Sequence, residues 1–489
     1  MSRFHILFAP HVSQRVKSRI SYSFRVFCAI YGHSVSDTNS LGVTLIAYGF
    51  GDDGSIFSGA ISLPARYVER APEQPAPRPE ATFFAGEQFD LFFGRDSRGN
   101  PDWLGEIFEW LAAADEMSIA KRDSADRIAF EDTVFARYQL SPARPRALLM
   151  MGWLEAYLRH AGAAAELVRA PSPAKGIDHW VVVSHDIDIY WTKTWPWMRR
   201  MERQLKNVVI SYMESRSPSV LFSGAARFFK ALLGMRVDDF IPALIEAEKL
   251  QEFRSTLFVI ANSPHRRDAN YAVAAIAPRL QQAAQQGFDV ELHGSYTSIV
   301  EKQDLLSEVN ALSGFSWRPP IANRQHWLRF DSHHRLFGAI EQAHLACDST
   351  LGFSNRAGFR HGASFSFPPY DFAREEPCNF LEIPLAIMDR ALVHEAMSSG
   401  KPYTELTEAV FRDSRRWGWG GFAVLWHNPI DDVYVPRDVN QILWQQARNR
   451  HAFCETWLSA AEFFTATLDR YKDAGLLKNF DLHAQPVYQ

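Results

Sequence analysis

The chain has 489 residues, of which 47% are hydrophobic and 22% charged, the composition of an ordinary soluble globular protein. This length exceeds that of most single domains, so we expect two domains. A net charge of −4 gives no electrostatic reason to expect a nucleic-acid partner. The four cysteines are scattered without a CxxC pair, which argues against a disulfide framework and against a thiolate zinc site.

The N-terminal sequence contains a short apolar patch at residues 6–9, which polar and basic residues soon interrupt. It does not have the pattern of a signal peptide, and the chain contains no apolar run long enough to span a membrane. The sequence therefore predicts a cytoplasmic protein without a transmembrane segment.

Residues 1–170 are expected to form a smaller, mixed α/β accessory domain. Apolar residues recur at helical spacing in three stretches, residues 13–31, 103–114 and 146–163. Nothing in this unit pairs a nucleophile with a base, so we interpret it as a structural or partner-binding module. Asp123 and Asp126 are interpreted as loop residues.

One stretch organises the rest of the chain. Residues 180–183 form an unbroken β-branched and aromatic run, which is typical of a strand buried on both faces of a parallel sheet. His185, Asp186 and Asp188 follow it, and strand alternation places the two aspartates on the same side of the strand end. Two such carboxylates need a shared metal, proton or cation, unless both are only turn or N-cap residues.

Residues 171–489 are predicted to form the second domain, an α/β unit. Short apolar runs at 255–261 and 288–292 alternate with helical patterns at 239–251 and 271–286, which favours a parallel sheet or barrel. Several of the apolar runs end in a polar residue. Active sites of such folds lie at the C-terminal ends of the strands, so we expect a shared cleft there.

Residues 191–236 follow the first strand and are rich in tryptophan, arginine and lysine. The segment could form a lid that stacks on sugar rings or pairs with acidic groups. It could equally form an amphipathic helix on the surface, and a membrane-surface role is a further alternative.

The motifs of the second domain resemble those of the polysaccharide deacetylase family, the NodB-homology domain with its distorted (β/α) barrel. The resemblance covers about residues 178–430. The first unit resembles the extra N-terminal domain of one bacterial branch of the family. The motifs that carry the resemblance are Ser-His-Asp-Ile-Asp, Leu-His-Gly-Ser-Tyr, Arg-Gln-His-Trp-Leu-Arg-Phe, Asp-Ser-Thr-Leu-Gly-Phe, Gly-Phe-Arg-His-Gly and Leu-Trp-His-Asn.

The resemblance implies a divalent metal, Zn²⁺, bound by Asp188 and His293. The family places a second histidine four residues after the first, where this chain has Thr297, a poor zinc ligand. His326, His185 or water could fill that position, and we expect His326 because it is the next strand-end histidine along the chain. Three protein ligands and one open position suffice for a catalytic zinc.

For catalysis, the resemblance implies a base at Asp186, held in place by Arg360, and a catalytic histidine at His427, with Asp389 as a candidate to orient it. Arg360 could instead pair with a structural carboxylate, and His427 could be a hydrogen-bonded core histidine. Trp191, Tyr296 and Trp426 are expected to contact a carbohydrate substrate.

These parts fit amide hydrolysis, which needs an activated water, a polarised carbonyl and an acid for the leaving amine. We therefore predict a metal-dependent hydrolase of C–N bonds, specifically an N-deacetylase of an acetylated sugar or glycan precursor. Two alternatives remain open: a metal-independent amidase of the same superfamily, and a non-catalytic carbohydrate-binding or scaffold protein.

Overall fold

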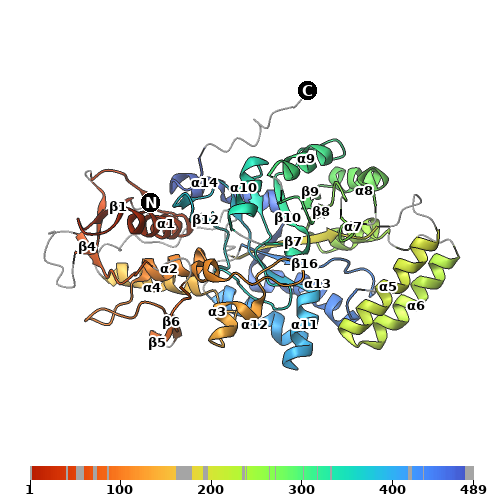
Figure 1. Ribbon diagram of the computed structural model, residues 1–489, viewed down its shortest axis with the longest axis horizontal. Helices are drawn as coiled ribbons and strands as arrows, with labels where there is room; N and C mark the ends of the chain where they lie inside the picture. The colour runs from red at the N-terminus through yellow and green to blue at the C-terminus, as the bar shows by residue number, and fades with distance from the viewer. Residues whose placement is uncertain are drawn as a thin grey trace.

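A computed structural model describes residues 3–478 of the protein, apart from residues 40–41, 51–59, 70–73, 85–86, 161–178, 191–196, 234–236, 238, 264, 270, 301, 317, 331–332, 417–420 and 433. The described chain is a mixed α/β structure with a large curled parallel sheet and, at one end, a smaller sheet (Figure 1). None of its described helices is both long enough and apolar enough to cross a membrane.

The N-terminal part is built around a four-stranded parallel sheet with the order β2-β1-β3-β4. Helix α1 (Gln14–Tyr31) begins at Ser13, whose hydroxyl accepts a hydrogen bond from the amide of Val16, and ends at Gly32 in the left-handed conformation. The other elements of this part are β1 (Arg3–Phe8), β2 (Ser34–Val35), β3 (Thr44–Tyr48), β4 (Ala60–Leu63), the hairpin β5 (Glu80–Phe84) and β6 (Glu87–Leu91), α2 (Trp103–Leu111), η1 (Ala114–Ser118), η2 (Phe130–Asp132), α3 (Val134–Arg137) and α4 (Arg146–His160).

The large sheet has the order β14-β11-β10-β9-β8-β7-β16-β15, with β17 also paired to β7, and all its strand pairs are parallel. Strand β7 (His179–Ile187) is buried along its whole length, as its apolar run predicts. Both ends of the order, β14 and β15, belong to one segment, residues 381–388, so the sheet curls back toward itself. The remaining strands are β8 (Thr256–Val259), β9 (Asp289–Gly294), β10 (Ala322–Gln325), β11 (Cys347–Asp348), β14 (Leu381–Glu382), β15 (Leu385–Met388), β16 (Phe422–Leu425) and β17 (Glu455–Leu458).

Helices join successive strands and pack around this sheet (Figure 1). They are α5 (Trp197–Ser215), α6 (Pro218–Leu232), α7 (Ile241–Leu250), α8 (Val273–Gln285), α9 (Lys302–Ser313), η3 (His326–Leu328), α10 (His333–Gln342), α11 (Asp389–Ser399), α12 (Tyr403–Arg416), α13 (Arg437–Asn449), η4 (Arg450–Phe453) and α14 (Ala460–Asp473), with a small ladder of β12 (Tyr370–Asp371) and β13 (Glu376–Pro377). The helical patterns predicted at 239–251 and 271–286 are thus α7 and α8. Within residues 191–236, the described residues form the helices α5 and α6.

The N-terminal part and the large sheet share a hydrophobic core. Phe24 of α1 and Phe108 of α2 belong to the same buried cluster as Trp180 of β7. The backbones also meet closely, because Gly358, at a φ of 143°, lies against Pro142 where a Cβ atom would come within 2.4 Å of the carbonyl carbon. A boundary between two domains near residue 170 stays a prediction, since this packing continues across it.

A buried ion pair adds to this junction. Arg360 donates two hydrogen bonds to the carboxylate of Glu116 in η1, at 2.9 and 2.7 Å, and both side chains are 5% exposed or less. A bidentate pair in this setting leaves an uncompensated charge in the interior if one partner is removed.

Replacing Glu116 with Ala should therefore lower the free energy of unfolding by about 3–5 kcal/mol, as measured by chemical denaturation. Glu405→Ala is the matched control, because it breaks a pair with Lys401 in which both side chains are more than half exposed. We expect less than about 1 kcal/mol from that change. Equal losses in the two variants would contradict a structural role for the buried pair.

Candidate active site

Polar side chains follow several strands of the large sheet at one rim. Because parallel strands all end at the same edge, residues far apart in sequence meet there. The strands concerned are neighbours in the order β10-β9-β8-β7-β16-β15. Their contributions are Asp186 and Asp188 from the end of β7, His293 from β9, His326 after β10, Asp389 after β15 and His427 after β16.

Three of these side chains form a cluster that could hold a metal ion. Ligand atoms of Asp188, His293 and His326 all lie within 4.8 Å of one another. Oδ1 of Asp188 is 3.2 Å from Nε2 of His293 and 3.6 Å from Nε2 of His326. In a tetrahedral zinc site with bonds of ~2.1 Å, two ligand atoms are about 3.4 Å apart, so these spacings fit zinc.

Both imidazoles of the cluster are oriented by hydrogen bonds at their other nitrogen. Nδ1 of His293 donates to the carbonyl oxygen of Arg324 at 2.6 Å, and Nδ1 of His326 donates to the carboxylate of Asp268 at 3.2 Å. Each Nε2 is therefore turned toward Asp188. Such outer hydrogen bonds are the usual support of metal-bound histidines.

The electrostatic environment of the cluster also favours a bound cation. Burial alone would raise the pKa of Asp188, but the imidazoles of His326 and His293 outweigh it and hold this pKa well below its usual range. Burial would lower the pKa of His326, yet Asp188 and Asp268 raise it to about 9. Oδ1 of Asp188 is buried between the Nε2 atoms of His293 and His326. A carboxylate oxygen flanked by two imidazole nitrogens is a donor set that fits a divalent cation.

Asp186 lies beside the cluster, held by a buried arginine. Its Oδ1 accepts a hydrogen bond from Nη1 of Arg324 at 2.8 Å, and its Oδ2 is 3.5 Å from Nε2 of His293. Arg324 is fully buried and also donates to the hydroxyls of Ser184 and Ser349. The guanidinium therefore has little freedom to turn away and holds the Asp186 carboxylate in place.

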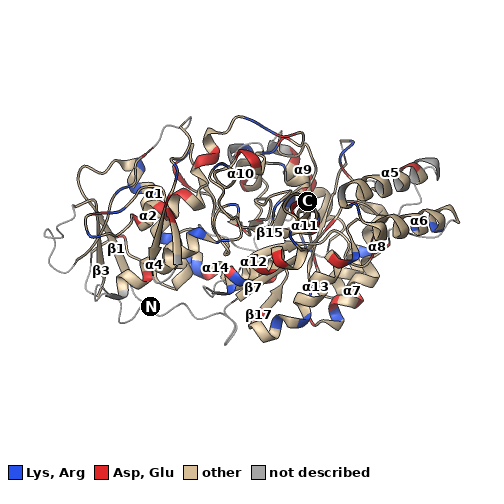
Figure 2. Cartoon of the chain, turned by 90° about the horizontal axis from the view of Figure 1, so that it is seen from below, with Lys and Arg blue, Asp and Glu red and all other residues tan. Residues whose placement is uncertain are grey.

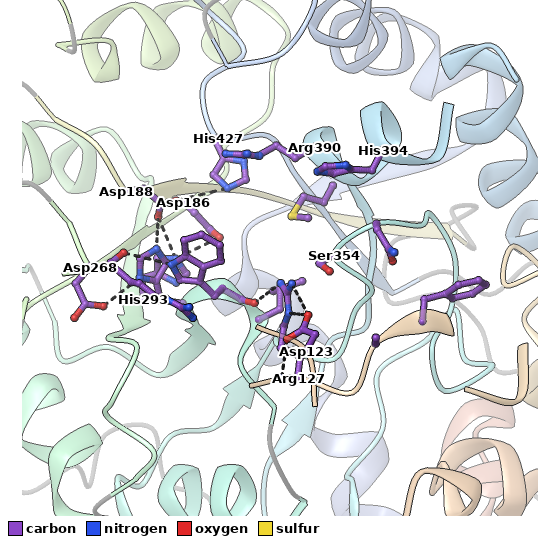
Figure 3. A pocket seen from close by; sticks show the side chains of 18 of the residues that line it. Asp123, Arg127, Asp186, Asp188, Asp268, His293, Ser354, Arg390, His394 and His427 are labelled. Carbon is purple, nitrogen blue, oxygen red and sulfur yellow. Dashed lines mark hydrogen bonds and ion pairs between the residues drawn. The ribbon is translucent and has the colours of Figure 1, made fainter. Parts of the chain in front are cut away.

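His427 faces Asp188 from the side opposite His293 (Figure 3). Nδ1 of His427 donates to Oδ1 of Asp389 at 2.8 Å, and Oδ2 of Asp389 accepts from the His427 amide at 2.9 Å. Nε2 of His427 is thus presented to the site, 3.7 Å from Oδ2 of Asp188. Burial lowers the pKa of His427, but Asp389 and the site carboxylates outweigh it and raise the pKa to about 9.

These groups line a pocket of about 520 Å³, a size common for small-molecule sites. One wall comes from the N-terminal part, through the segment that contains Asp123, Arg127 and Phe130. Figure 3 shows Asp123 and Arg127 across the pocket from His427. Asp123 does shape its own loop, by accepting from the amides of Ala125 and Arg127, but the loop borders the site.

The same N-terminal segment supports the backbone next to His326. Trp327 and Leu328 both have positive φ angles, 65° and 50°, which is uncommon for side chains of this size. Nη1 of Arg127 donates to the carbonyl oxygen of Trp327 at 2.8 Å, while the indole of Trp327 donates to the carbonyl oxygen of Arg267. Strained backbone of this kind persists where its surroundings hold it, and it is frequent at functional sites.

The structure corrects the expected contact of Arg360. Its guanidinium is bound to Glu116, and Arg324 takes the place beside Asp186. The alternative that Arg360 pairs with a structural carboxylate is the one the structure shows. The choice left open at Thr297 is also decided in geometric terms, because His326 joins the cluster while Nε2 of His185 is bound to Glu248 at 2.7 Å.

Two of the three aromatic residues expected to contact substrate, Tyr296 and Trp426, do not line the pocket. Trp426 is 2% exposed, in the core, with its indole donating to the carbonyl oxygen of Val439. The Tyr296 ring is covered by the guanidinium groups of Arg267 and Arg329, and its hydroxyl accepts from Arg267. Trp191 lies outside the described residues. Trp327, which is 45% exposed, is the tryptophan that lines the pocket.

Two supporting residues were missed in the sequence. Arg324 precedes His326 by two positions, so strand alternation could have placed both on the same face. Asp268 lies in the loop after β8, and no local pattern marks it. Its carboxylate accepts from the amides of Tyr296 and His265 as well as from His326, a contact that only the folded chain creates.

Comparison with known proteins gives structural likeness only. No family model matches the sequence, and no curated protein matches it. Similar solved structures include a candidate polysaccharide deacetylase from Mycobacterium smegmatis (14% identity, 64% of this chain and 96% of that chain, TM-score 0.37). They also include PuuE allantoinase (9%, 60% and 93%, TM-score 0.39) and a peptidoglycan deacetylase from Bacillus subtilis (8%, 60% and 93%, TM-score 0.28).

Polysaccharide and peptidoglycan deacetylases are thus among the structures that this chain resembles, as the motifs predict. At these identities and TM-scores the likeness says nothing about substrate or mechanism. Any assignment of function depends on the side chains of the site.

Replacing His326 or His293 with Ala should remove a bound divalent metal, because each substitution leaves only two of the three clustered ligands. Metal content is to be measured by plasma mass spectrometry after zinc loading and desalting. His394→Ala is the matched control, since His394 lines the same pocket outside the cluster and should leave the metal in place. Stoichiometric zinc in both cluster variants would show that the ligands are other residues.

Proposed function

We propose that the protein is a metal-dependent hydrolase of C–N amide bonds that removes the acetyl group from an acetylated sugar or glycan precursor. One observation carries the proposal: a cluster able to hold a metal ion lies between the carboxylate of Asp186 and the His427–Asp389 pair in one pocket. This combination suits amide hydrolysis, because a proton must leave the water and another must reach the amine.

Asp188, His293 and His326 would hold the metal, and the bound ion would supply a Lewis acid and a water of lowered pKa. Asp186 lies on one side of the cluster, and its salt bridge to Arg324 fixes the position of the carboxylate that would serve as the base. It accepts the proton of the attacking water.

His427 acts on the leaving group. Its hydrogen bond to Asp389 fixes the imidazole with Nε2 toward the site and favours the protonated form. It donates that proton to the nitrogen as the C–N bond breaks, so that the amine leaves uncharged. Asp186 lies at the end of β7 and His427 follows β16, so the two side chains reach the pocket from different strands. One can act on the water that attacks the carbonyl carbon, and the other on the amide nitrogen.

The pocket wall supports a substrate with both polar and apolar faces. Trp327 and Phe130 contribute rings, and Arg127, Arg267 and Arg390 contribute cationic groups. A sugar ring offers hydroxyls to the polar groups and C–H faces to the rings. A metal-independent amidase is less well supported, because it gives no role to the convergence of Asp188, His293 and His326 on one point.

Asp186→Asn and His427→Ala should each lower kcat about 10²–10⁴-fold on an N-acetylated sugar, with KM and zinc content much less affected. Both residues act in one proton-transfer sequence, so the double variant should lose much less than the product of the single losses. Steady-state kinetics with amine detection would measure this. Modest losses that multiply in the double variant would place the chemistry elsewhere.

Asp389→Asn should move the alkaline limb of the kcat profile to lower pH. The carboxylate of Asp389 stabilises protonated His427, so its removal lowers the pKa of His427, and the acid is lost earlier as pH rises. Arg360→Lys is a useful comparison, because Arg360 is bound to Glu116 and should leave the limb where it is. An alkaline limb unmoved in Asp389→Asn would exclude His427 as the acid.

A further inference from the structure

The helices α5 and α6 form a hairpin that stands out from the large sheet (Figures 1 and 2). The two helices pack along each other, and α5 also contacts α11, the helix that carries Arg390 and His394 of the pocket. The hairpin is inserted between β7 and α7. It lies outside the pocket lining and contributes no residue to the candidate active site.

Helix α6 is amphipathic, but its apolar face points outward. Its buried residues are Val220, Gly224 and Arg227, whereas Phe222 is 73% and Phe229 62% exposed. A surface helix of a globular protein normally shows the reverse arrangement, with the apolar stripe against the core. The outward stripe of α6 is therefore not covered by the described part of the chain.

Packing of the hairpin explains why the inner face of α6 is small and polar. Gly224 lies so close to Val208 of α5 that a Cβ atom would come within 2.5 Å of it. Arg227 is held by Asp431 at 2.9 Å and by the carbonyl oxygen of Val237. These contacts lock α6 in the orientation that presents both phenylalanines to solvent.

Helix α5 adds to the same kind of surface. Leu205, Val209 and Met213 are 55%, 47% and 58% exposed and follow one another at four-residue spacing, which aligns them on one side of the helix. Single exposed apolar residues are normal, but aligned sets on two packed helices mark an interaction surface. Here the surface occurs on a projecting element.

The charge of the hairpin indicates what covers it. Residues 197–232 contain seven Lys and Arg residues and two Glu, although the whole chain has a net charge of −4. Lys206, Arg216 and Lys230 are exposed among the described residues. Two copies of so basic a hairpin would repel each other. An anionic lipid surface offers both an apolar interior for the rings and negative head groups for the cations.

We propose that the α5–α6 hairpin docks the protein on an anionic membrane surface, with Phe222 and Phe229 inserted among the lipids. Docking is peripheral, since no described helix can span a membrane. The contact of α5 with α11 joins the hairpin to a helix that lines the pocket. Docking does not depend on the chemistry of the pocket, so it can be tested apart from the proposed hydrolase function.

The test is sedimentation of the full chain with vesicles of phosphatidylcholine alone and of phosphatidylcholine with 30% phosphatidylglycerol. We expect binding to the anionic vesicles that weakens as salt rises, and much weaker binding to the neutral ones. Phe222→Ser combined with Phe229→Ser should lower the partition coefficient by at least about tenfold, because two large apolar side chains are lost from the bilayer.

Phe83→Ser is the matched control, because Phe83 is 71% exposed on β5, away from the hairpin, and should leave vesicle binding unchanged. All three positions are exposed, so the variants should keep the circular dichroism spectrum and thermal midpoint of the parent. Failure of the parent to bind anionic vesicles would overturn the proposal. A second outcome would also overturn it: the parent forms a dimer in light scattering but does not bind vesicles, and only the Phe222→Ser and Phe229→Ser double variant loses the dimer. That result would identify a second copy of the chain as the occupant.

Discussion

The candidate site depends on one buried guanidinium. Arg324 leaves β10 and reaches Ser184 and Asp186 on β7, a contact between residues 138 positions apart, while its other nitrogens bind Ser349 after β11. Its plane also lies over the ring of Phe258 on β8, 4.4 Å from the centroid. A single side chain thus connects four strands of the sheet below the rim. A buried guanidinium with these partners has a single low-energy position. The carboxylate of Asp186, which is bound to it, is therefore fixed in position too.

The backbone of Arg324 also supports the cluster of Asp188, His293 and His326. The carbonyl oxygen of Arg324 accepts the Nδ1 proton of His293, so the residue that holds Asp186 also sets the tautomer of His293. Three residues later the chain turns through the left-handed positions of Trp327 and Leu328. This turn brings Nε2 of His326 to Asp188. Asp186, the cluster and the pocket wall are consequently coupled through one short segment, residues 322–328.

The N-terminal part has a larger share in the site than a separate accessory module would have. Asp126 binds Arg329, and Arg127 binds the carbonyl oxygen of Trp327. Glu116 holds Arg360 within the shared interior. These contacts are polar and directional, so they position the loops around the pocket more precisely than hydrophobic packing alone. The N-terminal part therefore completes the wall of the pocket.

The sequence by itself determined the features that depend on local order. The apolar run of β7 and the alternation of side chains placed Asp186 and Asp188 at a strand end, and the same kind of pattern located His293 and His427. Tertiary structure decided the pairings between strands. It assigned Asp186 to Arg324 and Arg360 to Glu116, chose His326 over His185 for the cluster, and turned the apolar face of α6 outward. Periodicity along a chain fixes the face on which a side chain lies, whereas its partner depends on which strands become neighbours when the sheet curls.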